Sequence, residues 1–396
     1  MRALKSPQAR NTGVSLIELL VAMAIGLVVT IAITNVMISF DRSKRTSTSV
    51  NDASQTSSFV GFSLDRSIRN AGSGFARRSE DAFGCRINAR LGGTNILPAT
   101  TAFPAPFDGI TGTALTRRLI PVLIEQNLAD SGSEVRGDIL SVMAGTAGMG
   151  EWPQRVSPTS VTASNFRLPN TLGWRGGDLV LLADKNVAGG CLVEQASAGF
   201  TGSASQTLTL NTTTATDVYY AATGSTVNLA DFGASSDTFA IQLGNPGLNN
   251  PPQFQMFAVG ANSILHSLNL LEAATSVPVA DGVIEMRALY GLDTDGDRVL
   301  NSWQDPGSGG YDAASLTNGS ATALTNLRKI VAVRVGLILR SSLRERDVVS
   351  GPTTITLFSD LPVALRRTRT LTTEEQHYRY RITEVTVPLR NMLFPL

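Results

Sequence analysis

An apolar run near the start of the chain constrains the fold more than any other feature. Residues 14–40 are apolar apart from a few scattered polar side chains. A helix over this run, at about 1.5 Å per residue, is long enough to cross a bilayer. The leader before it, residues 1–13, carries Arg2, Lys5 and Arg10 and no acid. A basic leader followed by an apolar run is typical of a targeting signal, and no small-residue secretory cleavage site follows this one.

One carboxylate, Glu18, lies inside the apolar run. An ionisable side chain in a membrane span is costly, and it indicates a function by default. Cleavage after Gly13 would create a cation near it, the α-amino group of Val14. The amine could pair with Glu18 of its own helix or of a neighbouring copy, and the sequence leaves both open. The spacing therefore predicts a role for Glu18 in assembly.

The stretch GVSLIELLVA, residues 13–22, resembles the signal of type IV pilins. That resemblance implies that a prepilin peptidase cuts after Gly13 and methylates the new N-terminus at Val14. It also implies that Glu18, then the fifth residue, supports docking of the subunit into a filament. The family usually has phenylalanine at the first mature position, so Val14 departs from the pattern. The alternative is a plain membrane anchor with an incidental glutamate.

The helical pattern continues beyond the apolar run. Small and apolar residues recur at a spacing of three to four, as on one face of an amphipathic helix: Val50, Ala53, Ser57, Val60, Leu64, Ser67 and Ala71. Gly72 and Gly74 are expected to stop the helix. The predicted fold class is α+β, in which a long N-terminal helix with a membrane-spanning first half packs on an antiparallel β-rich globular domain. The predicted organisation is a leader 1–13, a helix 14–76 with its transmembrane part at 14–40, a β-rich lobe 77–260 and a C-terminal β-sheet lobe 261–396.

Glycine and proline punctuate residues 79–110, which predicts a loop. Short apolar or alternating runs predict strands at 138–145, 178–184, 191–197, 206–211, 237–244, 283–291, 330–342 and 377–391. Alternation within 330–342 predicts a half-buried antiparallel strand. Within 377–391 the apolar residues change parity near Thr383-Glu384, which predicts a bulge or bend.

The chain has two cysteines, Cys85 and Cys191, and both follow the apolar segment. If that segment delivers the rest of the chain to an oxidising compartment, one disulfide is the simplest prediction. The alternative is a pair of buried free thiols. Neither cysteine has metal-ligand spacing and the chain has two histidines, which argues against a zinc site.

The segment DTDGDRVLNSWQD, residues 293–305, is the sharpest local motif. Its spacing is that of an EF-hand-like loop, with candidate Ca²⁺ ligands at Asp293, Asp295, Asp297, Val299 (through its carbonyl), Asn301 and Asp305. Clustered carboxylates repel one another unless a cation lies among them. The loop departs from the motif at position 6, where Arg298 replaces glycine, and at position 12, where Gln304 replaces glutamate. The alternative is a plain Asp-Gly turn, so no cofactor is certain and Ca²⁺ is the candidate.

The sequence gives little indication of an enzyme active site or of a nucleic-acid-binding surface. It has no nucleophile elbow, P-loop or dinucleotide fingerprint, and both histidines lie in ordinary settings, so we expect no catalytic residues. The net charge is +1, and the densest basic run, RRTR at 366–369, is short. A solvated or partner-docking face explains that run more simply than nucleic-acid binding does, and no nucleic-acid partner is expected.

The last third of the chain, through LYGLDTDGD, AVRVGLILRS and VPLRN, resembles the PilW group of minor pilins. This resemblance implies a minor pilin that primes type IV pilus assembly or forms the pilus tip with other minor pilins and an adhesin, in the service of adhesion and twitching motility. The expected partners are pilus subunits, the prepilin peptidase and the inner membrane, which holds the precursor with its globular domain in the periplasm. The alternatives are a type II secretion pseudopilin and a membrane-anchored periplasmic enzyme or binding protein.

Overall fold

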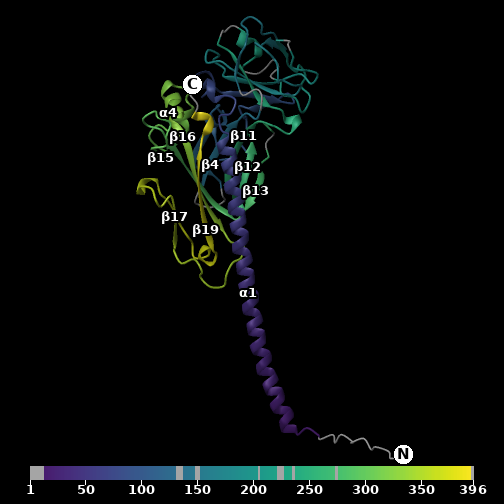
Figure 1. Cartoon of the computed structure of the whole chain (residues 1–396), viewed down its shortest axis with the longest axis vertical. Helices are drawn as coiled ribbons and strands as arrows, with labels where there is room; N and C mark the ends of the chain where they lie inside the picture. Colours follow the sequence, from purple (N-terminus) through teal and green to yellow (C-terminus); the bar gives the residue numbers. More distant parts are fainter. Residues whose placement is uncertain are drawn as a thin grey trace, which may run out of the picture. The chain divides into compact units, whose positions relative to one another are not determined.

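The computed structural model describes residues 13–130, 137–147, 152–203, 206–220, 227–233, 237–272 and 275–393. The chain divides into two compact units, Met1–Asp52 and Ala53–Leu396. One long helix, α1 (Leu16–Arg69), begins in the first unit and ends in the second (Figure 1). The fold is thus α+β, with a long N-terminal helix followed by an antiparallel, β-rich globular unit, as predicted.

The first unit is apolar and exposed. Among the described residues, α1 is the one helix with the length and composition to cross a membrane. Its large apolar side chains between Val14 and Phe40 have no protein covering them. The hydroxyl groups of Thr30 and Thr34 donate to the carbonyl oxygens of Gly26 and Thr30, at 2.7 and 2.8 Å. These bonds satisfy polar groups that lipid could not.

The second unit contains most of the secondary structure. A five-stranded antiparallel sheet has the order β13-β12-β11-β4-β3, made of β3 (Val122–Ala129), β4 (Gly137–Ala144), β11 (Gln253–Gly260), β12 (Ile264–Asn269) and β13 (Val277–Asp281). A four-stranded antiparallel sheet has the order β15-β14-β16-β19, made of β14 (Val283–Leu292), β15 (Ser302–Gln304), β16 (Ile330–Arg340) and β19 (Tyr380–Pro388). Figure 1 shows β16 and β19 side by side in the second unit.

A six-stranded sheet has the order β2-β1-β8-β7-β10-β5, made of β1 (Ile87–Leu91), β2 (Thr94–Leu97), β5 (Gln154–Arg155), β7 (Leu179–Ala183), β8 (Cys191–Gln195) and β10 (Phe239–Gly244). Two ribbons complete the β structure: β6 (Asn165–Arg167) with β9 (Thr207–Thr209), and β17 (Thr354–Leu357) with β18 (Arg367–Thr370). The short α-helices are α2 (Ser79–Ala82), α3 (Ala313–Thr317) and α4 (Ala321–Lys329). The 3₁₀ turns are η1 (Ala76–Arg78), η2 (Gly112–Leu115), η3 (Leu229–Gly233), η4 (Pro246–Leu248), η5 (Ala261–Ser263), η6 (Val363–Leu365), η7 (Glu375–His377) and η8 (Arg390–Met392).

The end of α1 contributes to the main core. Val60, Leu64 and Ile68 are buried in one cluster with side chains of the five-stranded and four-stranded sheets. Ile68, one position beyond the predicted Ser67, provides the last helical contact of this face. The helix ends at Arg69, short of the predicted residue 76, because Gly72 and Gly74 take φ values of +81° and +84°.

The boundary predicted between residues 260 and 261 does not separate two lobes. Strand β11 ends at Gly260 and pairs with β12, so the five-stranded sheet contains strands from both sides of that boundary. The second unit is continuous from Ala53 to Leu396. A smaller cluster lies between the six-stranded sheet and the β6–β9 ribbon, and it includes Phe166, Trp174 and Leu208.

The strand predicted at 330–342 is present as β16 and is antiparallel, but it is buried on both faces and not on one. Val335 packs into the main core. On the opposite face, Ile338 belongs to a cluster with the β17–β18 ribbon, and the ring of Phe358 packs closely over Gly336. The sequence of the strand alone could not indicate that its second face is buried, because the residues that cover this face belong to the separate β17–β18 ribbon.

The bulge predicted near Thr383-Glu384 is absent, since β19 keeps one register with β16 along its whole length. The change in parity has another cause: both faces of the strand are partly covered. Val385 packs beside Gly61 of α1, whereas Tyr380 packs against the cluster at the β17–β18 ribbon. The apolar side chains change face because the covering element changes.

The segment 79–110, predicted as loop, contains α2 and the β1–β2 hairpin. Its two turn residues, Gly92 and Gly93, have φ values of +58° and +78°. Two consecutive residues with positive φ are what a tight hairpin turn requires. The glycines that suggested irregular structure therefore mark a hairpin.

Candidate functional site

The start of α1 holds the predicted processing and assembly residues. Gly13 and Val14 precede the helix and are exposed, and a side chain added at Gly13 would meet no other atom. Glu18 accepts a hydrogen bond from the backbone N–H of Ser15 at 3.0 Å. Ser15 and Glu18 form one half of a capping box, in which a glutamate in the first turn satisfies a free N–H at the helix start.

The capping bond is a role that the sequence reasoning missed, although the spacing Ser-x-x-Glu was there to indicate it. Negative charge in a first turn is also favourable against the helix dipole. Glu18 therefore helps to begin the helix in the isolated chain. The cap uses one carboxylate oxygen, Oε2, so a second interaction with an amine at residue 14 remains compatible with it.

The disulfide prediction is confirmed. Cys85 and Cys191 are bonded, with their Cα atoms 5.6 Å apart. The bond lies where β1 runs parallel to β8, and the N–H of Cys191 donates to the carbonyl of Arg86 at 2.7 Å. The Asn88 side chain donates to the carbonyls of Gly189 and Cys191, both at 2.9 Å. The disulfide thus joins the β1–β2 hairpin to the rest of the six-stranded sheet.

The acidic loop brings three predicted ligands together. Asp293, Asp295 and Asp297 each offer an oxygen, and these atoms lie within 4.8 Å of one another. Asp293 accepts from the N–H groups of Gly296 and Arg298, at 2.6 and 2.8 Å. Burial would raise the pKa of Asp293, but these two hydrogen bonds, together with hydrogen bonds from Asp295, lower the pKa below its usual value.

The departure at position 6 does not prevent the turn. Arg298 takes a φ of +67°, the left-handed conformation for which a glycine is usual there. Two other predicted ligands, Asn301 and Val299, differ in how they contact the acidic cluster. Asn301 stays beside the cluster and donates to Asp295 at 2.9 Å. Val299 is exposed, and its N–H donates to Asp297 at 2.8 Å.

Asp305 is held away from the acidic cluster. Its carboxylate pairs with Arg367 at 2.8 Å and accepts from the Gln126 side chain at 3.0 Å and from the N–H of Gly307 at 2.8 Å. A carboxylate with three donors around it has little capacity left for a cation. The arrangement therefore supports a Ca²⁺ candidate made of Asp293, Asp295 and Asp297, without Asp305.

Calcium should raise the melting temperature of the full-length protein if these three carboxylates bind it. The expected affinity is that of an extracellular module, roughly 10⁻⁴–10⁻³ M, because the ligand set is incomplete. Asp295→Asn should abolish the shift, whereas Asp347→Asn, an exposed acid elsewhere, should leave it unchanged. Differential scanning fluorimetry with CaCl₂ and MgCl₂ measures this. An equal shift in the Asp295→Asn variant would show that calcium acts at another place.

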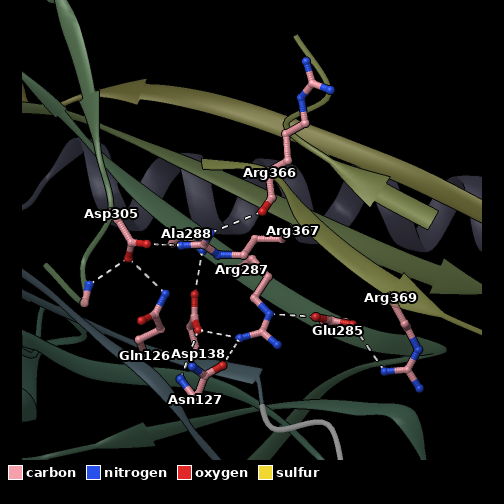
Figure 2. Close-up of polar contacts among 11 residues, drawn as sticks. Gln126, Asn127, Asp138, Glu285, Arg287, Ala288, Asp305, Arg366, Arg367 and Arg369 are labelled. Atoms are coloured by element: carbon pink, nitrogen blue, oxygen red, sulfur yellow. Dashed lines mark hydrogen bonds and ion pairs between the residues drawn. The ribbon is translucent and has the colours of Figure 1, made fainter. Parts of the chain in front are cut away.

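The basic run RRTR is not a free basic face. Arg367 pairs with Asp305, and Arg369 pairs with Glu285 and Glu375 at 3.3 and 2.6 Å. Figure 2 shows Arg367 directed at Asp305 and Arg369 directed at Glu285, with Arg366 pointing away from both carboxylates. Arg366 donates from Nε to the carbonyl of Leu361 at 2.7 Å. These ion pairs hold the β17–β18 ribbon to the body of the unit.

Comparison with known families gives two matches. A family model described as type IV pilus-assembly protein W matches residues 259–391, and one described as the prokaryotic N-terminal methylation motif matches residues 8–34. No curated protein and no solved structure matches the chain. The first match covers the four-stranded sheet and the acidic loop, and the second covers the leader and the start of α1.

A class III signal, an apolar helix of membrane-spanning length and a β-rich domain after it define a protein of the type IV pilin class. Within that class, the two matches point to a PilW-like minor pilin of a type IV pilus. Its place in the class implies interaction with other pilus components. The signal and the helix also fit a membrane-anchored pilin.

Proposed function

We propose that this minor pilin is cleaved after Gly13, is methylated at Val14 and then enters the pilus, where it primes assembly or forms the tip with other minor pilins and an adhesin. The observation that carries the proposal is Glu18 in a helix whose apolar side chains are exposed from Val14 to Phe40. Such a surface needs lipid or other helices around it. We further propose that the globular unit lies in the periplasm before assembly and that the protein has no enzymatic role.

The location of the charge favours assembly over simple anchoring. Glu18 lies in the first turn of α1, and cleavage after Gly13 would place the amine of Val14 near it. In a bundle of such helices, each carboxylate could reach the amine of a neighbour, an interaction that is stronger in a medium of low dielectric than in water. A type II secretion pseudopilin remains the alternative within the same machinery.

The variant Glu18→Gln separates the two roles of this residue. A glutamine can still accept the N–H of Ser15 and begin the helix, but it has no charge to pair with an amine. We expect the Glu18→Gln protein to be made and cleaved normally but lost from sheared pili. The matched control Asp41→Asn, an exposed acid at the end of the apolar run, should be incorporated like the wild type. Immunoblots of sheared pili and membranes distinguish these results.

The leader can be tested in the same cells. Gly13→Val should leave the protein at its precursor mass, because the cleavage position is changed while no neighbouring atom is disturbed. Mass spectrometry of the N-terminus reads both cleavage and methylation. Normal cleavage of Gly13→Val, or normal incorporation of Glu18→Gln, would contradict the proposed function.

A further inference from the structure

Strand β19 (Tyr380–Pro388) forms one edge of the four-stranded sheet and pairs only with β16 among the described strands. Two hydrogen bonds beyond its ends show which of its backbone groups face outward. The N–H of Leu389 donates to the carbonyl of Val331, and the N–H of Ser341 donates to the carbonyl of Arg379, both at 2.8 Å. Hydrogen-bonded pairs alternate along an antiparallel ladder. The odd-numbered residues of β19 therefore bond to β16, and the even-numbered residues direct their N–H and C=O groups away from it.

The outward backbone groups of β19 are open to another strand. No hydrogen bond to the backbone of Ile382, Glu384 or Thr386 is present within the described part of the chain. The side chains of Ile382 and Thr386 are exposed. Helix α1 covers a face of the strand and not this edge, since the side chain of Val385 packs beside Gly61. The edge thus presents a row of unpaired donors and acceptors.

The other edges of the three large sheets are blunted, as is usual in natural proteins. The edge strands β15, β2 and β5 have only three, four and two residues. Strand β13 contains Pro278, and β3 is interrupted by a shift of register between Glu125 and Ala129, where Asn127 has a φ of +57°. Among the described edges of these sheets, β19 alone is long and keeps one register, over nine residues. Such an edge is a template for an added strand.

One cation lies along this edge. Arg381 is exposed and has no ion pair with any described residue, whereas its neighbour Arg379 pairs with Glu345 at 2.8 Å. In an added antiparallel strand, the residue opposite Arg381 would form a non-hydrogen-bonded pair with it, in which the side chains are close. A carboxylate at that position stabilises the pairing, and a cation there opposes it. The charge of Arg381 therefore selects an acidic strand.

A second copy of β19 does not supply this carboxylate. When two such edges pair antiparallel, outward residues meet outward residues, so odd-numbered positions lie opposite odd-numbered positions. The one acid of the strand, Glu384, is even-numbered and lies on the opposite face from Arg381. Glu384 is also held in an ion pair with Arg334. The edge therefore fits a partner other than the same chain.

We propose that the edge of β19 binds an extended segment of another protein, with an aspartate or glutamate opposite Arg381. The segment adds an antiparallel strand to the four-stranded sheet, and its backbone bonds to Ile382, Glu384 and Thr386. This surface is separate from the N-terminal signal, and neither cleavage of the leader nor entry into a pilus is needed for binding.

Fluorescence anisotropy with the full-length protein in detergent micelles tests the charge selection. The probe is a labelled, capped peptide of sequence Thr-Val-Thr-Val-Asp-Val-Thr, whose valines share the face of Ile382 when its aspartate faces Arg381. Its counterpart has lysine in place of the aspartate. The aspartate peptide should bind roughly two- to fivefold more tightly, the usual worth of a cross-strand ion pair. Arg381→Glu should reverse this preference. Arg155→Gln, an exposed arginine on the short edge strand β5, is the matched control and should bind both peptides like the wild type.

The variant Ile382→Pro tests the backbone pairing. Proline removes one outward N–H and no bond to β16, a change that edge strands tolerate. Binding of both peptides should be lost while the circular dichroism spectrum stays that of the wild type. If Ile382→Pro fails to fold, the reversal in Arg381→Glu decides, because that change is confined to an exposed side chain.

Three results with the peptides overturn the proposal: no binding by the wild type, equal affinity of the wild type for both peptides, or binding that survives Ile382→Pro. Analytical ultracentrifugation of the protein without peptide gives a fourth. Self-association of the wild type that Ile382→Pro abolishes would show that a second copy occupies the edge, against the proposed acidic partner.

Discussion

Replacing Arg287 with methionine is expected to lower the free energy of unfolding by about 3–5 kcal/mol. Arg287 lies on β14 and is largely buried. It donates to Asp138 at 3.0 Å and to Glu285 at 2.7 Å (Figure 2). Asp138 is fully buried, and removal of the arginine would leave its carboxylate without a cation.

The network extends across three parts of the second unit. Asp138 of β4 also accepts from the N–H groups of Ala288 and Asn127, at 3.0 and 3.2 Å. Glu285 also forms an ion pair with Arg369 of β18, and Arg369 forms a further ion pair with Glu375. Arg287 therefore connects the five-stranded sheet, the four-stranded sheet and the β17–β18 ribbon. Replacement of Arg287 therefore removes a buried charge from the centre of a series of linked ion pairs.

The loss of stability in the Arg287→Met protein should depend on pH, and the direction of that dependence follows from the pKa of Asp138. Burial, the largest cause, raises the pKa of Asp138 in the folded protein even though Arg287 opposes the shift. When the pKa of a carboxyl group is higher in the folded than in the unfolded protein, its contribution to the free energy of unfolding is fully present below the pKa of the unfolded state. This contribution is lost as the pH rises through the pKa of the folded state. Without Arg287 the folded pKa rises further. The Arg287→Met protein should therefore be destabilised more at about pH 7 than at about pH 5.

Urea denaturation of the full-length protein in micelles, followed by near-ultraviolet circular dichroism, measures this effect. Asp138→Asn combined with Arg287→Met should cost less than the sum of the two single changes, because the orphaned carboxylate is gone. Arg344→Met is the matched control, since Arg344 pairs with Glu374 on the exposed surface and should contribute little. If Arg287→Met and Arg344→Met are equally stable, the buried network does not stabilise the unit.

Local patterns allowed much of this structure to be predicted from sequence. The start of α1 shows in its hydropathy, its end in Gly72 and Gly74, and strands such as β14 and β16 in their apolar runs. The disulfide prediction needed only two cysteines that both follow the apolar segment. Each of these signals is contained in a short stretch of chain, or in a simple count, so no knowledge of tertiary contacts was necessary.

The features that could not be predicted depend on residues far apart in sequence. The run RRTR has the composition of a basic patch. In the folded protein, however, Arg367 pairs with Asp305 and Arg369 pairs with Glu285, and both carboxylates precede the run by tens of residues. The parity change in β19 reflects α1 on one face and the β17–β18 ribbon on the other. The bridge between Arg86 and Arg118 likewise joins two segments that are separate in sequence.

Removal of the disulfide is expected to have the second large effect. The bond joins residues separated by 106 positions, so its loss frees a long loop in the unfolded chain. Loops of this length give stabilisation near the upper end of the usual range, and we expect the double variant Cys85→Ala with Cys191→Ala to lose about 2–5 kcal/mol. The change also removes the covalent link between the β1–β2 hairpin and β8, which leaves their parallel pairing to hydrogen bonds alone.

Two comparisons separate the crosslink from the packing of the cysteine side chains. Wild-type protein reduced with dithiothreitol should unfold at nearly the same urea concentration as the double variant, since both lack the covalent bond. Single replacement of either cysteine should cost at least as much, because it leaves a free thiol in the buried position of Cys191 or beside it. Should the double variant and the oxidised wild type unfold at one urea concentration, the hairpin is held by its hydrogen bonds from Asn88 and Cys191, and the crosslink contributes nothing to the stability of the unit.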